Sequence, residues 1–201
     1  EVICLQQATK GKGIDFIFMG DGFVDKDMEP GGKYETLMRR WMEQLFVYEP
    51  YKSFREWFSI YVVKVVSKND VFNCPSSERK LTRDDGNGDF GNTISTLNSI
   101  ASEYAGKATS GPKRISVFMN TENNSVGRSF CSFSSSGYFN AWVFDSIDRR
   151  PSTFIHEAGG HGFGLLGDEY SEFDSAFSGQ ESLDNNHNWG YYPNLDWRSD
   201  P

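Results

Sequence analysis

Residues 156–161 have the sequence His156-Glu157-Ala158-Gly159-Gly160-His161, and Asp168-Glu169-Tyr170 follows a few residues later. Two neutral imidazoles with a carboxylate beside the first are the parts of a catalytic zinc site. The histidines would hold the metal and the glutamate would act on its bound water. The histidines lie five positions apart, one more than in the common zinc-peptidase motif. Whether they form a metal site therefore depends on the shape of the helix that carries them.

The five-residue spacing of the two histidines predicts a distorted helix. In a regular α-helix, residues five apart lie about 140° apart around the axis, so two such imidazoles could not bind one ion. One inserted residue, a π-bulge, would bring the second imidazole back to the face of the first, and such bulges are frequent at functional sites. Gly159 and Gly160 lie where the bulge is needed, although each glycine weakens a helix by roughly 1 kcal/mol. We therefore expect the helix to bulge between His156 and His161.

A zinc ion that keeps one position for water needs a third protein ligand. Asp168 follows a glycine-rich stretch, residues 162–167, in which glycines would let the chain leave the helix and turn back sharply. Asp168 is therefore the preferred third ligand. Glu169 is the nearest alternative, and His187, the remaining histidine of the chain, is a more distant one.

The rest of the chain shows strand and helix patterns in alternation. Strands are expected over residues 14–19, 58–66 and 114–119, helices over 34–49, 93–104 and from 151 through the histidines, and an irregular segment over 120–137. This order indicates an α/β layer with a mainly parallel or mixed sheet. No internal repeat or linker is visible, so residues 1–201 are expected to form one domain. Gly20-Asp21-Gly22 ends the first strand in a tight turn, and Asp21 either completes that turn or helps to shape a cleft.

Composition limits the classes of function. Aromatic residues make up 15% of the chain, which predicts a large aromatic core. The net charge is −8, so the chain has no electrostatic reason to bind nucleic acid or an anionic membrane surface. No apolar run approaches the ~20 residues of a membrane-spanning helix.

Taken together, these motifs resemble the IgA-peptidase family of zinc metallopeptidases. The resemblance rests on His156-Glu157, Gly160-His161, Gly164, Leu166 and Asp168-Glu169-Tyr170, with support from residues 17–23 and from Pro50-Tyr51, Phe54 and Phe58. It covers most of the chain from about Asp15 to Tyr170.

The resemblance implies a zincin or metzincin-like catalytic domain, in which a twisted mixed sheet packs on an active-site helix. It implies a zinc-dependent endopeptidase with His156 and His161 as ligands, Glu157 as the general base and Asp168 as a further ligand. Tyr170 is a candidate donor to the oxyanion, with His187 as the alternative. The expected partner is a protein or peptide substrate, with a host glycoprotein such as an immunoglobulin suggested by the family's name. The expected location is secreted, periplasmic or at the cell surface.

Two other functions compete with this one. The first is a catalytically inactive binding module that keeps the fold and attaches to glycoproteins or cell-surface partners. Retention of Glu157 argues against it, because an inactive domain has no need of the base. The second is a zinc exopeptidase or dipeptidase.

The five methionines all precede His156, so the methionine turn that metzincins place below the zinc has no counterpart after the motif.

Overall fold

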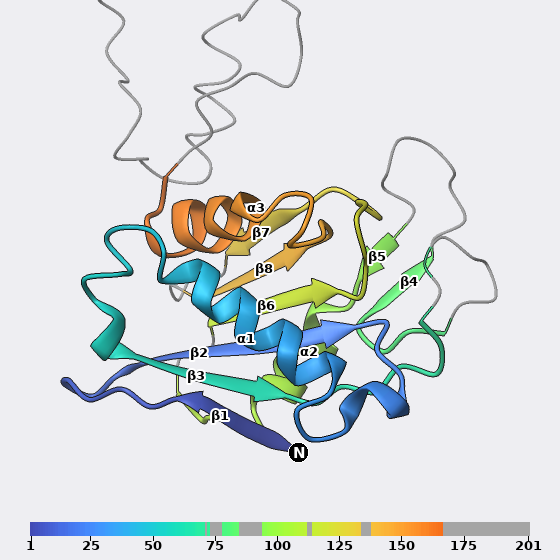
Figure 1. The fold of residues 1–201 in the computed structure, drawn as a ribbon, viewed down its shortest axis with the longest axis horizontal. Helices are drawn as coiled ribbons and strands as arrows, with labels where there is room; N and C mark the ends of the chain where they lie inside the picture. Colours follow the sequence, from blue (N-terminus) through green and yellow to red (C-terminus); the bar gives the residue numbers. More distant parts are fainter. Residues whose placement is uncertain (71, 73–77, 85–93, 112–113, 134–137, 167–201) are drawn as a thin grey trace, which may run out of the picture.

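A central sheet with helices on both faces forms the fold (Figure 1). The structure, a computed structural model, describes residues 1–70, 72, 78–84, 94–111, 114–133 and 138–166. In this part of the chain the strands are β1 (Val2–Gln6), β2 (Ile14–Asp21), β3 (Phe58–Val63), β4 (Thr82–Asp84), β5 (Ile94–Thr96), β6 (Arg114–Met119), β7 (Phe130–Phe133) and β8 (Phe139–Val143). The helices are η1 (Asp25–Met28), α1 (Lys33–Leu45), η2 (Arg55–Trp57), α2 (Asn98–Ala105), α3 (Ser152–Phe154) and η3 (Ile155–Phe163). We call residues 152–163, which comprise α3 and η3, the histidine helix.

Six of the described strands form one mixed sheet in the order β1-β3-β2-β6-β8-β7. The inner strands β3, β2, β6 and β8 run parallel, and the edge strands β1 and β7 each pair antiparallel with their neighbour. Strands β4 and β5 form a separate antiparallel pair. The predicted mixed α/β fold is therefore confirmed, and the expected strands over 14–19, 58–66 and 114–119 correspond to β2, β3 and β6.

Strand β2 shows why both faces of the sheet are covered. Phe16 and Phe18 enter one hydrophobic cluster, and Ile17 and Met19 enter the other, all fully buried. A parallel strand buried on both faces has this continuous apolar run. Side chains of α1 and the histidine helix complete the first cluster, and those of α2 complete the second. The histidine helix therefore shares its core with α1, on one side of the sheet.

Aromatic side chains dominate the first cluster, as the composition predicts. Trp41 of α1 stacks on Phe118 of β6 with ring centroids 4.9 Å apart, and both rings contact Phe154 of the histidine helix. Such pairs add roughly 0.5–1.5 kcal/mol each beyond the buried area. Helix α1 ends at Leu45, four residues before the predicted end, and the ring of Phe46 then packs against Phe58.

Two of the expected elements are wrong in part. The helix expected over 93–104 begins only at Asn98, because Ile94–Thr96 pairs with Thr82–Asp84 as a strand. The segment expected to be irregular over 120–137 contains β7, which pairs with β8. In both places pairing with a distant segment overrides the local pattern. In the part of the chain that the structure describes, no helix is long and apolar enough to cross a membrane.

Asp21, at the end of β2, has a structural role in the described fold. Its carboxylate is fully buried and accepts hydrogen bonds from Ser67 Oγ, the backbone N–H groups of Lys80 and Leu81, and Thr82 Oγ1. A buried carboxylate needs such donors to offset its desolvation. Asp21 therefore fixes the segment that leads into β4.

Candidate metal centre

The histidine helix changes its winding where the sequence predicts a bulge. Residues 152–154 are α-helical, and residues 155–163 form a π-helix. In this winding the N–H of Gly164 bonds the carbonyl of Gly159, five residues earlier, at 2.8 Å. The predicted departure from the α-helix is confirmed, and it is longer than the single bulge expected, because nine consecutive residues adopt it. Hydrogen bonds between residues five apart place such residues nearly above one another, which is what the two histidines need.

The two imidazoles meet on one face of this helix. His156 Nε2 and His161 Nε2 lie 3.1 Å apart, and the ring centroids are separated by 4.6 Å. Two Zn–N bonds of about 2.0–2.1 Å with tetrahedral geometry place their nitrogen atoms about 3.3 Å apart. The observed separation is close to that value, so both Nε2 atoms can bind one ion with little movement.

The backbone selects the tautomer of His161. Its Nδ1 lies 2.6 Å from the carbonyl oxygen of Leu166. A carbonyl oxygen only accepts hydrogen bonds, so Nδ1 carries the proton and Nε2 of the neutral ring presents its lone pair. This arrangement, a ring N–H that donates to a carbonyl behind the metal-facing nitrogen, is usual for metal-binding histidines. The carbonyl returns to His161 because Leu165 adopts a left-handed conformation, with φ of 52°. A turn was expected here from the glycines, but Leu165 is the residue that makes it.

Glu157 supplies a carboxylate beside the two histidines. One ligand atom from each of His156, Glu157 and His161 lies within 4.8 Å of the others. Glu157 is 6% exposed, so its carboxylate is largely shielded from bulk water. Burial and the charge of Glu157 both raise the pKa of the Cys131 thiol on β7. Cys131 therefore stays protonated at neutral pH and is a poor nucleophile.

Close packing explains two of the glycines in the helix. A Cβ at Gly159 would lie 3.0 Å from Cε2 of Tyr51, and one at Gly162 would lie 2.8 Å from two ring atoms of Phe139. A Cβ at Gly160 would meet nothing closer than the carbonyl oxygen of Ile155 at 3.8 Å. Gly159 and Gly162 therefore let the helix approach neighbouring aromatic rings, and Gly160 has space for a side chain.

Aromatic rings hold the far end of the histidine helix against the sheet. The ring of Phe163 contacts Phe16 of β2, Phe58 of β3 and Phe139 of β8, with centroid distances between 4.9 and 5.5 Å. Tyr51 approaches from the segment between α1 and η2, and its hydroxyl donates a hydrogen bond to the carbonyl of Gly159 at 2.7 Å. The backbone between the histidines is therefore held by a side chain as well as by its own helix.

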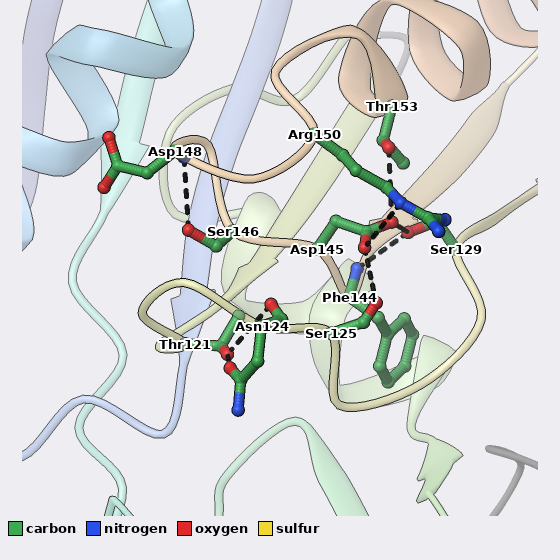
Figure 2. Close-up of polar contacts among 10 residues, drawn as sticks. All are labelled: Thr121, Asn124, Ser125, Ser129, Phe144, Asp145, Ser146, Asp148, Arg150 and Thr153. Carbon is green, nitrogen blue, oxygen red and sulfur yellow. Dashed lines mark hydrogen bonds and ion pairs between the residues drawn. The ribbon is translucent and has the colours of Figure 1, made fainter.

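A polar group fixes the other end of the helix, as Figure 2 shows. Asp145, which follows β8 and is 5% exposed, accepts hydrogen bonds from the hydroxyls of Ser125, Ser129 and Thr153. Thr153 belongs to the first turn of the histidine helix. A carboxylate near a helix N-terminus also interacts favourably with the helix dipole. Asp145 therefore ties the start of this helix to the end of β8.

The structure brings together three of the site residues that the sequence predicts, namely His156, Glu157 and His161. Asp168, Tyr170, Glu169 and His187 lie outside the described residues, so the third ligand and the oxyanion donor stay predictions. Sequence reasoning missed Tyr51, Asp145 and the carbonyl of Leu166 as supports of the site. Tyr51 belongs to the stretch that supports the family resemblance, but no local pattern indicates its contact with Gly159, which is 108 positions away.

The fold and the site define a class: a mixed α/β protein in which one helix presents a His-Glu-His group able to hold a metal ion. Residues 3–189 match the model of the IgA Peptidase M64 family, and the chain therefore belongs to this family. Its class of activity is accordingly that of a peptidase, a hydrolase of peptide bonds. None of the curated proteins matches the chain.

Proposed function

We propose that the chain is a zinc-dependent endopeptidase. The observation that carries this proposal is the 3.1 Å separation of the two Nε2 atoms, with a buried carboxylate beside them. The hydrogen bond from His161 Nδ1 to Leu166 supports it, because it prepares the other ring nitrogen as a ligand. In the same proposal Asp168 is the third ligand, and residues 1–201 form one catalytic domain of the zincin or metzincin-like kind.

A zinc ion held by His156 and His161 would supply Lewis-acid chemistry, which lowers the pKa of water and polarises a peptide carbonyl. The chain's own residues do the rest. Glu157 accepts the proton of the attacking water and later passes it to the leaving amine. Its shielded position strengthens this role, because electrostatic interactions are stronger away from bulk water. Tyr170 is proposed to donate a hydrogen bond to the oxygen of the carbonyl under attack.

The proposed substrate is a protein or peptide outside the cytoplasm, where a secreted, periplasmic or cell-surface enzyme would meet it. A host glycoprotein such as an immunoglobulin is one candidate. Binding of nucleic acid is not expected from a chain with a net charge of −8.

The test of the mechanism is the Glu157→Gln variant, with Glu103→Gln as its control. Glu103 is an exposed residue of α2, on the opposite side of the sheet from the histidine helix. Glu157→Gln keeps the shape of the side chain and removes the base. We expect its zinc content to be unchanged and its rate of peptide hydrolysis to fall by roughly 10²–10⁴. Glu103→Gln should retain the wild-type rate.

Three results would contradict the proposal in different ways. A Glu157→Gln variant that binds zinc and cleaves at the wild-type rate would refute the role of the glutamate. A wild-type protein that binds no zinc would refute the metal site. A folded protein that binds zinc but cleaves none of a broad set of protein substrates would favour the inactive binding module instead.

A further inference from the structure

The π-helical winding of the histidine helix has to be maintained against the α-helix. In an α-helix the carbonyl of Gly159 would accept the N–H of Phe163, four residues later. In the structure it accepts the N–H of Gly164 instead, at 2.8 Å. The π-helix is rare because its hydrogen bonds do not by themselves favour it over the α-helix. Something outside the helix must therefore favour this register.

Tyr51 makes a contact that can favour the π-helical register. Its hydroxyl donates to the same carbonyl, that of Gly159, at 2.7 Å, and this bond is buried. A carbonyl oxygen has two lone pairs, so it can accept both hydrogen bonds at once. A change to the α-helical register would turn the backbone between His156 and His161 and move this carbonyl away from the hydroxyl.

The position of Tyr51 is fixed by its surroundings. The side chain is 8% exposed, and its ring lies against the aromatic rings of Phe58 and Phe163, at centroid distances of 6.3 and 6.0 Å. Its Cε2 atom lies 3.0 Å from the point where Gly159 would carry a Cβ. Burial raises the pKa of the Tyr51 hydroxyl to about 12, so it remains protonated and able to donate at neutral pH.

We propose that Tyr51 is a positioning residue for the metal site: its hydroxyl bond to Gly159 selects the π register, which sets the separation of His156 and His161. The inference rests on the proposed metal site. It assigns to Tyr51 a role in metal affinity that acts through the backbone and involves no contact with the metal. Any buried tyrosine of the core could support stability, but this one holds the carbonyl midway between the two ligands.

The chain offers a matched control for this role. Tyr34 of α1 is fully buried in the same core cluster, donates to the carbonyl of Val63 at 2.6 Å and accepts the N–H of Gly20 at 2.8 Å. Its hydroxyl bonds therefore join β2 and β3 and do not involve the histidine helix. Tyr34→Phe and Tyr51→Phe remove the same atom from the same core, and both should reduce stability. The Tyr51→Phe variant should fold, because it keeps the buried aromatic ring and loses a single hydroxyl hydrogen bond.

The experiment is titration of the two metal-free variants and the wild-type protein with Co²⁺ and Zn²⁺. We expect Tyr51→Phe to weaken metal binding by about 10–100-fold, the range for residues that orient metal ligands, and to change the visible absorption of the Co²⁺ complex. Tyr34→Phe should bind within about twofold of the wild type. The inference is overturned if the wild type binds the metals and Tyr51→Phe binds them equally well with an unchanged Co²⁺ spectrum.

A second measurement needs no metal and separates this inference from the proposed function. In the metal-free proteins, hydrogen exchange of the Gly164 amide reports the bond that closes the π register. We expect exchange to accelerate in Tyr51→Phe more than in Tyr34→Phe. Equal acceleration in the two variants would refute the role of Tyr51 in the register. Failure of the wild type to bind metal would refute the proposed function, and the exchange result would still decide whether Tyr51 controls the register.

Discussion

Substitution of Gly162 by alanine tests the close packing of the histidine helix on the sheet. The new Cβ would lie 2.8 Å from Cε2 and Cζ of Phe139 and 2.9 Å from its Cδ2. The optimal separation of two carbon atoms is about 3.5–4.0 Å, so something must move. Phe139 is 2% exposed and its ring is held between Phe16 and Phe163, at centroid distances of 5.8 and 4.9 Å, so it has little space to give way.

The size of the effect follows from comparison with Gly160→Ala. Alanine favours a helix over glycine by about 1 kcal/mol, and this gain applies at both positions and cancels between the variants. Overpacking a core typically costs about 1–3 kcal/mol, and only Gly162→Ala incurs it. Gly162→Ala should therefore be less stable than Gly160→Ala by about 1–3 kcal/mol. In a domain of this size the difference corresponds to roughly 2–12 °C in Tm.

The assay is thermal and urea unfolding of the two metal-free variants and the wild type, followed by circular dichroism. Both variants carry one added methyl group in the same helix, so they differ in what that group meets. Equal stability of the two variants would refute the packing argument. A Gly160→Ala variant that is the less stable of the two would contradict it further, because position 160 has space for the methyl group.

Two further predictions concern buried polar groups. Asp21→Asn should lower the free energy of unfolding by at least about 2 kcal/mol, because charged hydrogen bonds contribute about 1.5–3 kcal/mol each. Asp15→Asn, which affects one hydrogen bond from Thr109, is the control. Equal losses of stability in the two variants, measured by urea unfolding, would contradict this prediction. The pKa of Tyr51 is raised from 10.0 to about 12 by burial, so the stability due to its neutral hydroxyl is fully present below pH 10 and is lost as the pH rises toward 12. The difference in unfolding free energy between the wild type and Tyr51→Phe should therefore shrink as the pH rises from 10 toward about 12. The measurement is urea unfolding from pH 9 to about 12. A difference that stays constant over this range would disprove the prediction.

Local patterns in the sequence are sufficient to predict three of the four inner strands, β2, β3 and β6, and a departure of the histidine helix from α-geometry. The apolar runs of β2 and β6 have the composition of buried strands, and the spacing of His156 and His161 is compatible with one metal only if the helix departs from α-geometry. The prediction of a distorted helix therefore came from geometry and needed no knowledge of the rest of the fold.

Contacts between distant segments could not be predicted in this way. Strand β5 falls in a stretch with a helical pattern and becomes a strand because it pairs with β4. The support of the metal site by Tyr51 and Asp145 depends on how the chain folds back on itself, and no local pattern indicates that either residue contacts the histidine helix. The left-handed conformation of Leu165 could not be predicted either. Leucine rarely adopts it, and the neighbouring glycines are the expected positions for such a turn.

In the proposed site, a π-helix brings His156 and His161 to a single metal ion. The most direct measurement is a crystal structure of the zinc-loaded protein with the anomalous signal of zinc. We expect one zinc peak about 2.0–2.1 Å from Nε2 of both histidines, with residues 155–163 still π-helical. An α-helix through these residues with the two rings pointing apart, or a zinc peak that involves neither histidine, would contradict it.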